Sequence, residues 1–352
     1  MAKNGGLTLD IDRLRNARVL CIGDVMLDHY VYGEVDRLSP EAPVPVLAVD
    51  SESYSLGGAG NVLRNLAALG AGISFVSVVG NDDAGREVQN LLAALDSAEI
   101  HVLVQPQRKT TVKTRFIAVN QHLLRADRES AIALGPYIRD DLLRLARELV
   151  TSHDVIVISD YAKGVLTDGV ALEIIKTAQE AGARVVAEPK GGDHIRYRGA
   201  DLLIPSRREL AEATGMPTTT ASEIMAAAHA LIDRCGFGAV LVTLGREGMI
   251  LVESHRSASF ETFAGDSYDP GGTEDTAVAT IAAGLGAGLQ LMEAAELESL
   301  AMNIVGGKAG TAVASAGELA AALAGEAGSE IREVALRVEM APQPRRRHKR
   351  EA

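Results

Sequence analysis

The sequence predicts an α/β fold with a mainly parallel sheet, and two observations support this prediction. Short apolar runs rich in β-branched residues, such as residues 17–22 and 73–79, alternate with segments of helical spacing such as residues 62–69. This alternation is typical of parallel strands joined by crossover helices. Glycine and polar residues also follow most of these runs, at the sheet edge where α/β proteins bind ligands.

The order of elements follows from the same alternation. Residues 17–22 are expected to form the first buried strand, and residues 73–79 the second. The strands predicted farther along are residues 154–159, 184–187, 202–205, 239–243 and 249–252, and the helices are residues 62–69, 85–95, 168–181, 220–235 and 276–291.

Two segments depart from this alternation. Residues 43–50 and 100–127 are β-rich without intervening helices, and residues 120–121 have the composition of a hairpin turn. We expect segments near residues 43–55 and 100–127 to form a small second sheet that serves as a lid over a pocket. An edge hairpin without such a role is the alternative.

The chain is expected to form one domain, residues 10–330, followed by a C-terminal extension, residues 331–352. A length of 352 residues fits one large domain or two ordinary ones, and an apolar fraction of 47% is ample for a packed core. Residues 342–352 are strongly basic and contain two prolines, which predicts a solvated, disordered tail.

Composition excludes several classes of function. A net charge of −12 and an aromatic fraction of 3% argue against a nucleic-acid-binding protein. Two cysteines cannot build a zinc cluster and suggest no disulfide framework. No secretory signal and no apolar stretch of about 20 residues is visible, so we expect a soluble cytoplasmic protein that does not bind membranes.

A glycine-rich turn precedes the helix predicted over residues 62–69. Gly57, Gly58 and Gly60 permit close approach of the backbone to a ligand, and Asn61 adds a side-chain donor and acceptor. The spacing differs from that of dinucleotide-binding turns, and the lysine of a Walker loop is missing. A polyol-binding turn is favoured, with an ordinary tight turn as the alternative.

Charged residues follow two of the predicted strands. Asp24 and Asp28 come after the first strand, where carboxylates can grip sugar hydroxyls. Asp160 and Lys163 come after the strand over residues 154–159, and the lysine can hold a phosphate. Turn-forming or surface roles are the alternatives.

Three later strands end in small or polar residues that suit a bound nucleotide. Glu209 lies in one of these segments, and its carboxylate can hold hydrated Mg²⁺ through water. The other residues at these strand ends are Lys190, Ser206, Thr243, Gly245 and Gly248.

The most informative segment is residues 268–276. Gly271 and Gly272 form a flexible turn that opens into an Ala/Gly-rich helix, whose first backbone N–H groups can face an anion. Asp275, in the first turn, is placed to accept the proton of a hydroxyl that attacks a phosphate. An ordinary aspartate N-cap is the alternative.

Together these segments resemble the ribokinase-like (PfkB) carbohydrate kinases, and within that family the D-glycero-β-D-manno-heptose-7-phosphate kinases. The resemblance covers roughly residues 10–318, and its motifs follow in the order that the family has. They are GDVMLDHYVYGEVDRLSPEAPVPVL (23–47), GGAGNVLRNLAALGA (57–71), VGNDDAGRE (79–87), NQHLLRAD (120–127), SDYAKGVLT (159–167) and KGGDHIRYRGADLLIPSRREL (190–210).

The resemblance implies a ribokinase-like three-layer sandwich with a small β lid. It also implies transfer of the γ-phosphoryl group of ATP, with Mg²⁺, to the C1 hydroxyl of D-glycero-D-manno-heptose 7-phosphate, for ADP-heptose and lipopolysaccharide core synthesis. A homodimer formed through the lid is a further implication. The H-x-G-H signature of a nucleotidyltransferase is missing from the sequence, so we expect a stand-alone kinase rather than a fused enzyme.

Matching positions to the family's motifs assigns a role to each candidate residue. Asp275 is the catalytic base, and Glu209 holds the metal through water. The anion hole comprises Gly271, Gly272, Thr273 and Glu274; the substrate-binding residues are Asp24, Asp28, Gly57, Gly58, Asn61, Arg125, Asp127, Asp160 and Lys163; and the nucleotide-binding residues are Lys190, Ser206, Thr243, Gly245, Gly248 and Asn303.

Three motifs depart from the family's pattern, all on the nucleotide side. Glu188 replaces the aspartate of D-P-K-G, Ser206 replaces the asparagine of P-N-x-x-E, and Glu274 replaces the last glycine of D-x-T-G-A-G-D. A Glu274 carboxylate about 4 Å from the transferring phosphoryl group would cost about 4 kcal/mol, or about a thousandfold in rate, whereas one directed to solvent would cost little. Two alternatives therefore stand beside the heptose kinase: a catalytically impaired sugar-phosphate-binding protein, such as a regulatory subunit, and a PfkB kinase for another sugar.

Overall fold

The computed structural model describes residues 10–119, 121–167, 169–261, 272–308 and 311–324, and its central sheet confirms the α/β prediction. The sheet has nine strands in the order β13-β12-β11-β10-β9-β8-β1-β4-β5. The strands from β5 to β11 are parallel to their neighbours, whereas β12 and β13 run antiparallel at one edge. The strands are β1 (Arg18–Gly23), β4 (Gly72–Gly80), β5 (Ala98–Gln105), β8 (Val155–Ser159), β9 (Arg184–Glu188), β10 (Leu202–Leu203), β11 (Ala239–Thr243), β12 (Met249–Glu253) and β13 (Ser257–Phe260).

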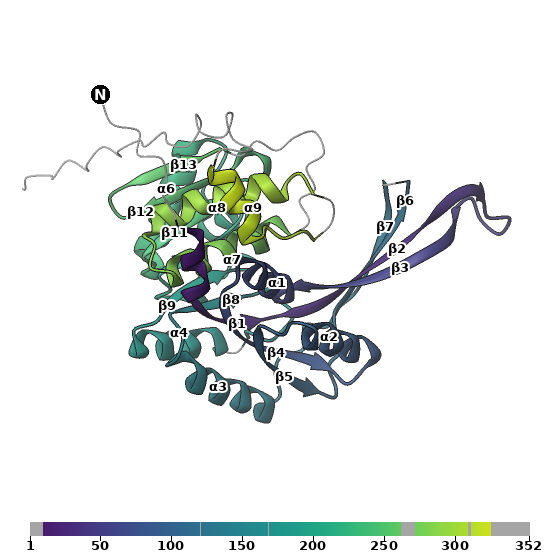
Figure 1. The fold of residues 1–352 in the computed structure, drawn as a ribbon, viewed down its shortest axis with the longest axis horizontal. Coiled ribbons are helices and arrows are strands. Elements are labelled where there is room, and N and C mark those ends of the chain that lie inside the picture. The colour runs from purple at the N-terminus through teal and green to yellow at the C-terminus, as the bar shows by residue number, and fades with distance from the viewer. Residues whose placement is uncertain (1–9, 120, 168, 262–271, 309–310, 325–352) are drawn as a thin grey trace, which may run out of the picture.

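Helices cover both faces of this sheet, as Figure 1 shows. One core contains side chains of α1, α2, α7 and α8, and the other contains side chains of α3, α4, α5 and α6. The α-helices are α1 (Ala59–Leu69), α2 (Asp83–Ala93), α3 (Pro136–Val150), α4 (Val170–Ala181), α5 (Arg207–Thr214), α6 (Ala221–Cys235), α7 (Thr273–Gly286), α8 (Leu291–Val305) and α9 (Ala316–Ala324), and short 3₁₀ turns span Ile11–Asn16, His194–Tyr197 and Gly245–Glu247.

Strand β1 illustrates how the sequence supplies both cores. Val19 and Cys21 belong to one core, whereas Leu20 and Ile22 belong to the other. Because successive side chains of a strand point to opposite faces, an unbroken apolar run is what a sheet covered on both faces requires. Local signals then set the helix ends: Asp82, for example, caps α2 by accepting a hydrogen bond from the backbone of Gly85.

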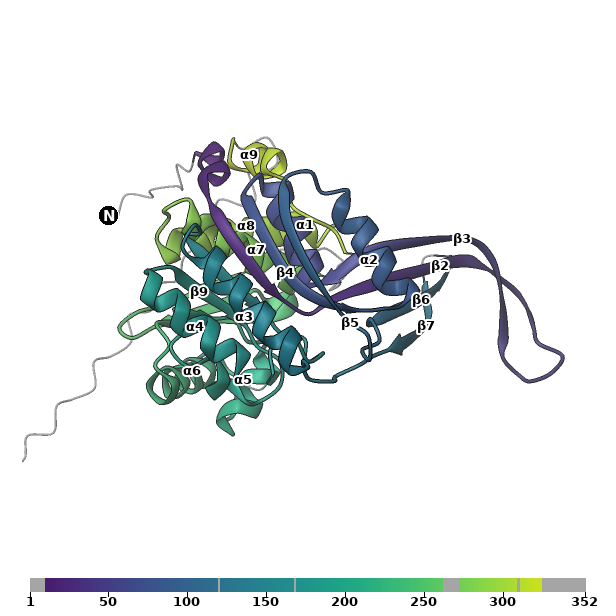
Figure 2. The same ribbon diagram turned by 90° about the horizontal axis from the view of Figure 1, so that it is seen from below.

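A second sheet projects from the body as an arm in both views (Figure 1, Figure 2). Its four strands, in the order β3-β2-β6-β7, are β2 (Val25–Leu38), β3 (Pro45–Gly58), β6 (Val112–Ala118) and β7 (Gln121–Arg128). The outer halves of β2 and β3 are exposed, and their inner halves are buried against the main body.

The small sheet differs from the sequence prediction in two respects. Strand β2 was not predicted, because its residues follow the first strand directly and no turn signal separates the two. Residues 98–105, most of which were expected in the small sheet, form β5 of the main sheet instead. The alternating apolar residues of β5 pack on both faces of that sheet, with Ile100 and Val102 on one and Leu103 on the other.

Two further expectations can be compared with the structure only in part. Within the described ranges, no helix is long and apolar enough to span a membrane. The C-terminal extension, residues 331–352, lies outside the described residues.

Candidate active site

A solvent-open pocket of about 130 Å³ lies where the two sheets meet, beside the carboxyl ends of the parallel strands β1, β8 and β9. It brings together residues that the sequence assigned to different roles, since Asp28 and Gly58 of the sugar motifs face Asp275 of the anion-hole motif. Its lining residues are Met26, Asp28, Gly58, Lys113, Arg115, Tyr161, Gly272, Glu274, Asp275 and Thr311.

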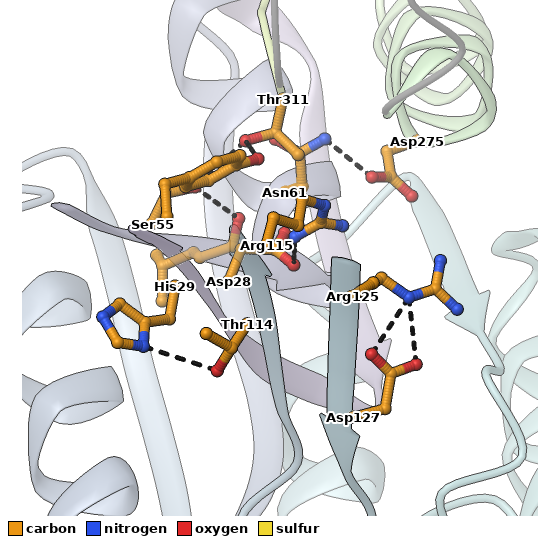
Figure 3. Close-up of polar contacts among 12 residues, drawn as sticks. Asp28, His29, Ser55, Asn61, Thr114, Arg115, Arg125, Asp127, Asp275 and Thr311 are labelled. Atoms are coloured by element: carbon orange, nitrogen blue, oxygen red, sulfur yellow. Dashed lines mark hydrogen bonds and ion pairs between the residues drawn. The ribbon is translucent and has the colours of Figure 1, made fainter. Parts of the chain in front are cut away.

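Asp275 lies in the first turn of α7 and is buried. Its Oδ2 accepts a hydrogen bond of 2.6 Å from Asn61 Nδ2 on α1, as Figure 3 shows, and its Oδ1 accepts one from the hydroxyl of Tyr161. Burial raises the pKa of Asp275 to about 6, although these two donors favour the ionised form. The carboxylate is therefore ionised at neutral pH but close to its pKa, as suits a general base.

Gly272 lets the helix start approach Asn61. Its φ of 82° is in the left-handed region, and a Cβ atom at this position would lie 2.6 Å from Asn61 Nδ2. Because α7 begins directly after this residue, the first backbone N–H groups of the helix open beside the pocket and can receive an anion. Gly271, the other glycine of the predicted anion hole, lies outside the described residues, and Thr273 is the first residue of the helix.

Asp28 and Arg115 form a buried ion pair on the small sheet. Arg115 Nη1 lies 2.6 Å from Asp28 Oδ1, and the two side chains are 16% and 3% exposed. A Cβ atom at Gly57 would lie 2.4 Å from Asp28 Oδ2, so only glycine leaves room for this carboxylate. Gly58 has a φ of 58°, and a Cβ atom there would meet the carbonyl oxygen of Asp24 at 2.6 Å.

Lys113 and Arg115 are basic residues of the pocket that the sequence analysis missed. They are two residues apart on β6 and both line the pocket. Partial burial lowers the pKa of the Lys113 ammonium. The two basic residues alternate with Val112, Thr114 and Phe116, and this period of two was a signal that could have identified them.

The predicted basic residues Arg125 and Lys163 are engaged in ion pairs elsewhere. Arg125 pairs with Asp127 at 3.0 Å on the edge strand β7, where Figure 3 shows the two side chains turned toward each other. Lys163 Nζ lies 2.9 Å from a Glu129 carboxylate oxygen. None of these four side chains lines the pocket.

Asp24 and Asp160 are buried, and the protein itself occupies their oxygens. The Asp24 carboxylate accepts three backbone N–H groups, from Tyr161, Lys163 and Val165, each at 3.0 Å. Asp160 Oδ2 accepts the hydroxyl of Tyr197 at 2.6 Å, and its Oδ1 accepts the backbone N–H of Ala162 at 2.7 Å. These carboxylates shape the loop that carries Tyr161.

The predicted nucleotide residues form a second cluster at the sheet edge. Ser206 caps α5, and Glu209 completes the capping box by accepting the Ser206 backbone N–H and hydroxyl at 3.0 and 2.7 Å. Lys190 Nζ lies 2.9 Å from the other oxygen of Glu209. Thr243 pairs with Ser206 in an isolated parallel bridge.

Glu209 and Lys190 of this cluster shift each other's pKa values. Burial alone would raise the pKa of Glu209, but the bonds from Lys190 and Ser206 outweigh it and lower the pKa. Likewise burial alone would lower the pKa of Lys190, but the carboxylates of Glu209, Glu274 and Glu188 outweigh burial and raise this pKa.

The remaining nucleotide candidates surround this cluster. Gly248 has a φ of 92°, and a Cβ atom there would lie 1.9 Å from the carbonyl oxygen of Phe260, so this glycine serves strand packing. Gly245 has a φ of 61° and open space around it. Asn303 is half-buried on α8.

Glu274 is one of the residues that line the pocket, and it is also exposed to solvent. Desolvation raises the pKa of its carboxyl group, and the charge of Lys190 acts against this shift. The family's glycine is therefore replaced here by an acidic residue at the rim of the pocket, with Lys190 as an opposing charge.

Arg64 and Thr311 support the pocket and were also missed. Arg64 Nη1 donates to Asn61 Oδ1 at 3.1 Å and to the carbonyl oxygen of Thr311 at 3.0 Å. Asn61 and Arg64 are three residues apart on one helix, so their spacing was a usable signal. No sequence signal brings Thr311 to α1.

The match to known families identifies the fold and the general chemistry. Residues 16–316 match the model of the "pfkB family carbohydrate kinase". The chain belongs to the pfkB family of carbohydrate kinases. The ribokinase-like prediction is therefore confirmed.

Relatives and solved structures agree with this assignment. The chain is 48% identical to the bifunctional protein HldE of Paramagnetospirillum magneticum over 92% of this chain and 66% of that protein, and 47% identical to that of Rhodospirillum rubrum over 88% and 63%. It thus spans less than two thirds of the length of these relatives. The tetrameric inhibited form of phosphofructokinase-2 from Escherichia coli superposes with a TM-score of 0.74 at 19% sequence identity, over 88% of this chain and 98% of that one. Arabidopsis thaliana ribokinase complexed with ribose and ATP superposes with a TM-score of 0.67 at 20% sequence identity, over 87% of this chain and 98% of that one.

Proposed function

We propose that this pfkB-family protein phosphorylates the C1 hydroxyl of D-glycero-D-manno-heptose 7-phosphate with ATP, giving the 1,7-bisphosphate. The observation that carries the proposal is the buried Asp275 carboxylate at the start of α7, directly opposite Asp28 and Arg115 in one pocket. The relatives named bifunctional protein HldE and the heptose-kinase motifs support the choice of sugar. The product would serve ADP-heptose and lipopolysaccharide core synthesis in the cytoplasm.

The sugar phosphate binds on the side of the small sheet. Asp28 accepts hydrogen bonds from sugar hydroxyls, and Arg115 holds it in place. Lys113 and Arg115 supply the positive charge that meets the 7-phosphate. This arrangement leaves the C1 hydroxyl toward Asp275, on the opposite wall of the pocket.

Asp275 acts as the general base. It accepts the proton of the C1 hydroxyl while that oxygen attacks the γ-phosphorus, and the bond from the γ-phosphorus to the bridging oxygen breaks to release ADP. The helix N-terminus after Gly272 stabilises the negative charge of the transferring group. Asn61 and Tyr161 hold the carboxylate in place throughout.

The residues present fit the phosphates of ATP. The absence of a side chain at Gly272 lets the start of α7 lie against Asn61, and Lys190, 46% exposed, can exchange its ion pair with Glu209 for a phosphate. Mg²⁺, when bound with the nucleotide, neutralises charge on the transferring phosphoryl group. Glu209 fits a role through water only, since Ser206 and Lys190 occupy its oxygens; movement of Lys190 toward ATP frees one of them.

The test is ADP release with Mg-ATP and a panel of sugar phosphates that includes heptose 7-phosphate. We expect turnover on heptose 7-phosphate and a loss of about a thousandfold or more in the Asp275→Asn variant, because the amide cannot accept the proton. Turnover on a different sugar alone would replace the substrate but keep the kinase. Absence of turnover on every sugar would overturn the proposal.

One observation favours a second candidate, a sugar-phosphate-binding protein impaired in phosphoryl transfer. Glu274 adds a carboxylate to the pocket wall where the family has glycine. The same assay separates the two candidates when it is combined with calorimetric binding of the sugar phosphate. Binding without turnover supports the impaired protein, whereas turnover supports the kinase.

We also propose that the arm pairs with a second copy of this chain. The strands of the arm and the loop between β2 and β3 expose large apolar side chains, and apolar surface of this kind suits an isologous two-fold contact. They include Val35, Leu38, Val44, Val49 and Leu124. Light scattering should give the mass of a dimer, and Leu38→Asp should give that of a single chain; a monomeric parent protein would contradict the proposal.

A further inference from the structure

A phenol hydroxyl lies between two buried carboxylates at the edge of the pocket. The Tyr161 hydroxyl donates to Asp275 Oδ1 and lies 3.2 and 3.1 Å from Oε1 and Oε2 of Glu188. Glu188 and Asp275 are 5% and 6% exposed. The three residues come from the loop after β8, the end of β9 and the first turn of α7, and the mechanism above leaves Glu188 without a role.

One hydroxyl proton cannot serve both carboxylates. Tyr161 has a single O–H donor, and of the three carboxylate oxygens within its reach Asp275 Oδ1 is the nearest. An ionised Glu188 would then meet only the lone pairs of the phenol oxygen, and two anions would flank one hydroxyl in a buried site. If Glu188 carries a proton, Glu188 donates to the phenol oxygen, Tyr161 donates to Asp275, and each group has a partner.

The other hydrogen-bond partners of Glu188 and Asp275 also fit a protonated Glu188 and an ionised Asp275. Ser159 Oγ donates to Glu188 Oε2 at 2.9 Å, and Asn61 Nδ2 donates to Asp275 Oδ2 at 2.6 Å. Glu188 Oε1 has only the Tyr161 hydroxyl as its partner among the described residues, so this oxygen is the one that carries the proton. Asp275, with two donors, is the better stabilised anion.

The surrounding charges act in the same direction. Burial raises the pKa of Glu188 well above its ordinary value, the nearby Asp275 and Glu274 carboxylates raise it further, and together they outweigh the hydrogen bonds from Ser159 and Tyr161, which lower it. The titratable and charged groups that interact with the pair are Cys21 on β1, Asp28 on β2, Arg64 on α1, Lys190 after β9 and Glu274 on α7, and Glu209 on α5 interacts in turn with Lys190 and Glu274. Four of these six groups are acidic or neutral, and the two cations are each bound to another partner.

We propose that Glu188 and Tyr161 are positioning residues for Asp275: Glu188 holds a proton at neutral pH and donates it in a hydrogen bond to Tyr161, whose hydroxyl donates to the Asp275 carboxylate. No covalent bond changes in this arrangement, and the proton stays on Glu188. Its effect is to keep a deeply buried Asp275 ionised and correctly oriented. The catalytic meaning of this inference depends on the proposed kinase activity, whereas the protonation state does not.

The pH profile of kcat/KM tests the catalytic part. Glu188→Gln imitates a protonated Glu188, because its amide also donates to the phenol oxygen, so the acid limb that reports Asp275 should stay in place. Tyr161→Phe removes a donor from an anion and should move that limb upward by about one to two pH units. Tyr197→Phe, which removes a hydroxyl from the buried Asp160, is the matched control and should leave the limb in place.

The opposite result has a distinct signature. If Glu188 is ionised in the working enzyme, Glu188→Gln removes a negative charge beside Asp275, and the acid limb moves to lower pH. That shift would overturn the proposal. A double variant, Tyr161→Phe with Glu188→Gln, should behave like Tyr161→Phe alone, because Glu188 acts through the phenol.

Carboxyl ¹³C NMR of the glutamate-labelled protein without substrate measures the protonation state directly. The Glu188 resonance is assigned by its loss in Glu188→Gln. We expect a protonated carboxyl at neutral pH that titrates only at higher pH, and a resonance already ionised at pH 6 would overturn the inference. If Glu188 is protonated but the protein turns over no sugar, the inference about Glu188 stands and the proposed kinase activity is overturned. If Glu188 is ionised in an active kinase, the kinase activity stands and the inference about Glu188 is overturned.

Discussion

The two sides of the candidate site are built by different means; we call them the wall of the small sheet and the nucleotide wall, which is the cluster of Lys190, Ser206, Glu209 and Thr243 beside the pocket. On the wall of the small sheet, backbone sterics fix the site: Gly57 and Gly58 cannot accept a Cβ atom, and Asp28 is held in a buried ion pair by Arg115. On the nucleotide wall, accessible or capping side chains hold one another by charge, as Lys190 and Glu209 do. We infer that substitutions on the wall of the small sheet disturb the site strongly, whereas the nucleotide wall retains its structure when its charged residues are substituted.

The largest expected effect is on the wall of the small sheet. Arg115→Ala leaves the Asp28 carboxylate buried without its partner, at a cost of about 3–5 kcal/mol. We expect calorimetry without ATP to give sugar-phosphate binding at least about a hundredfold weaker. Arg125→Ala, which breaks an exposed pair on the neighbouring strand, is the control and should bind almost normally. Equal losses in both variants would remove the distinction between the walls.

Glu274→Gly should raise kcat. It removes a carboxylate from the anion-hole side of the pocket and restores the family's residue. Full repulsion would be about 4 kcal/mol at 4 Å, but the opposing charge of Lys190 reduces it, so we expect an increase of about tenfold to a hundredfold. Glu274→Gln, which removes only the charge, should recover most of this gain; a slower Glu274→Gly enzyme would show that the carboxylate assists the reaction.

We expect stability to depend on pH through Glu298, in the helical layer behind the nucleotide wall. This side chain on α8 is 1% exposed, its Oε2 has no hydrogen-bond partner among the residues that the structure describes, and burial raises its pKa to about 8. Because the folded state holds a proton that the unfolded state loses above pH 4.5, stability should fall on the order of 1 kcal/mol per pH unit from about pH 4.5 to 8. Chemical denaturation should show a weaker pH dependence in Glu298→Gln. An unchanged slope would contradict this account.

The smallest effect is expected at Ser206. Asparagine and serine cap helices about equally well, so Ser206→Asn, which restores the family's residue, should change stability by no more than about 0.5 kcal/mol. Ser206→Ala removes the cap of α5 and should cost about 1 kcal/mol. Thermal unfolding of the two variants measures the difference. A large loss in Ser206→Asn would show that the nucleotide wall is as rigid as the other.

The sequence by itself determined the α/β fold, the helix that begins after Gly272 and the candidate base Asp275. Period-two and helical spacing are local properties, and glycine turns before helices follow from backbone sterics that neighbouring residues already define. The ordered motifs also identified the family. The same local patterns predicted that Asp24 and Asp160 face a ligand. In the sequence, an aspartate after a strand has the same pattern whether its carboxylate binds a sugar or the backbone of its own chain.

Tertiary structure decided the rest. It gave Asp24 three backbone partners, placed Glu274 among the residues that line the pocket, and brought the hydroxyl of Tyr161 between Glu188 and Asp275. It also moved residues 98–105 into the main sheet. These outcomes depend on contacts between segments far apart in the chain, and both the pairing of strands and the sharing of a proton depend on distances that no local pattern encodes.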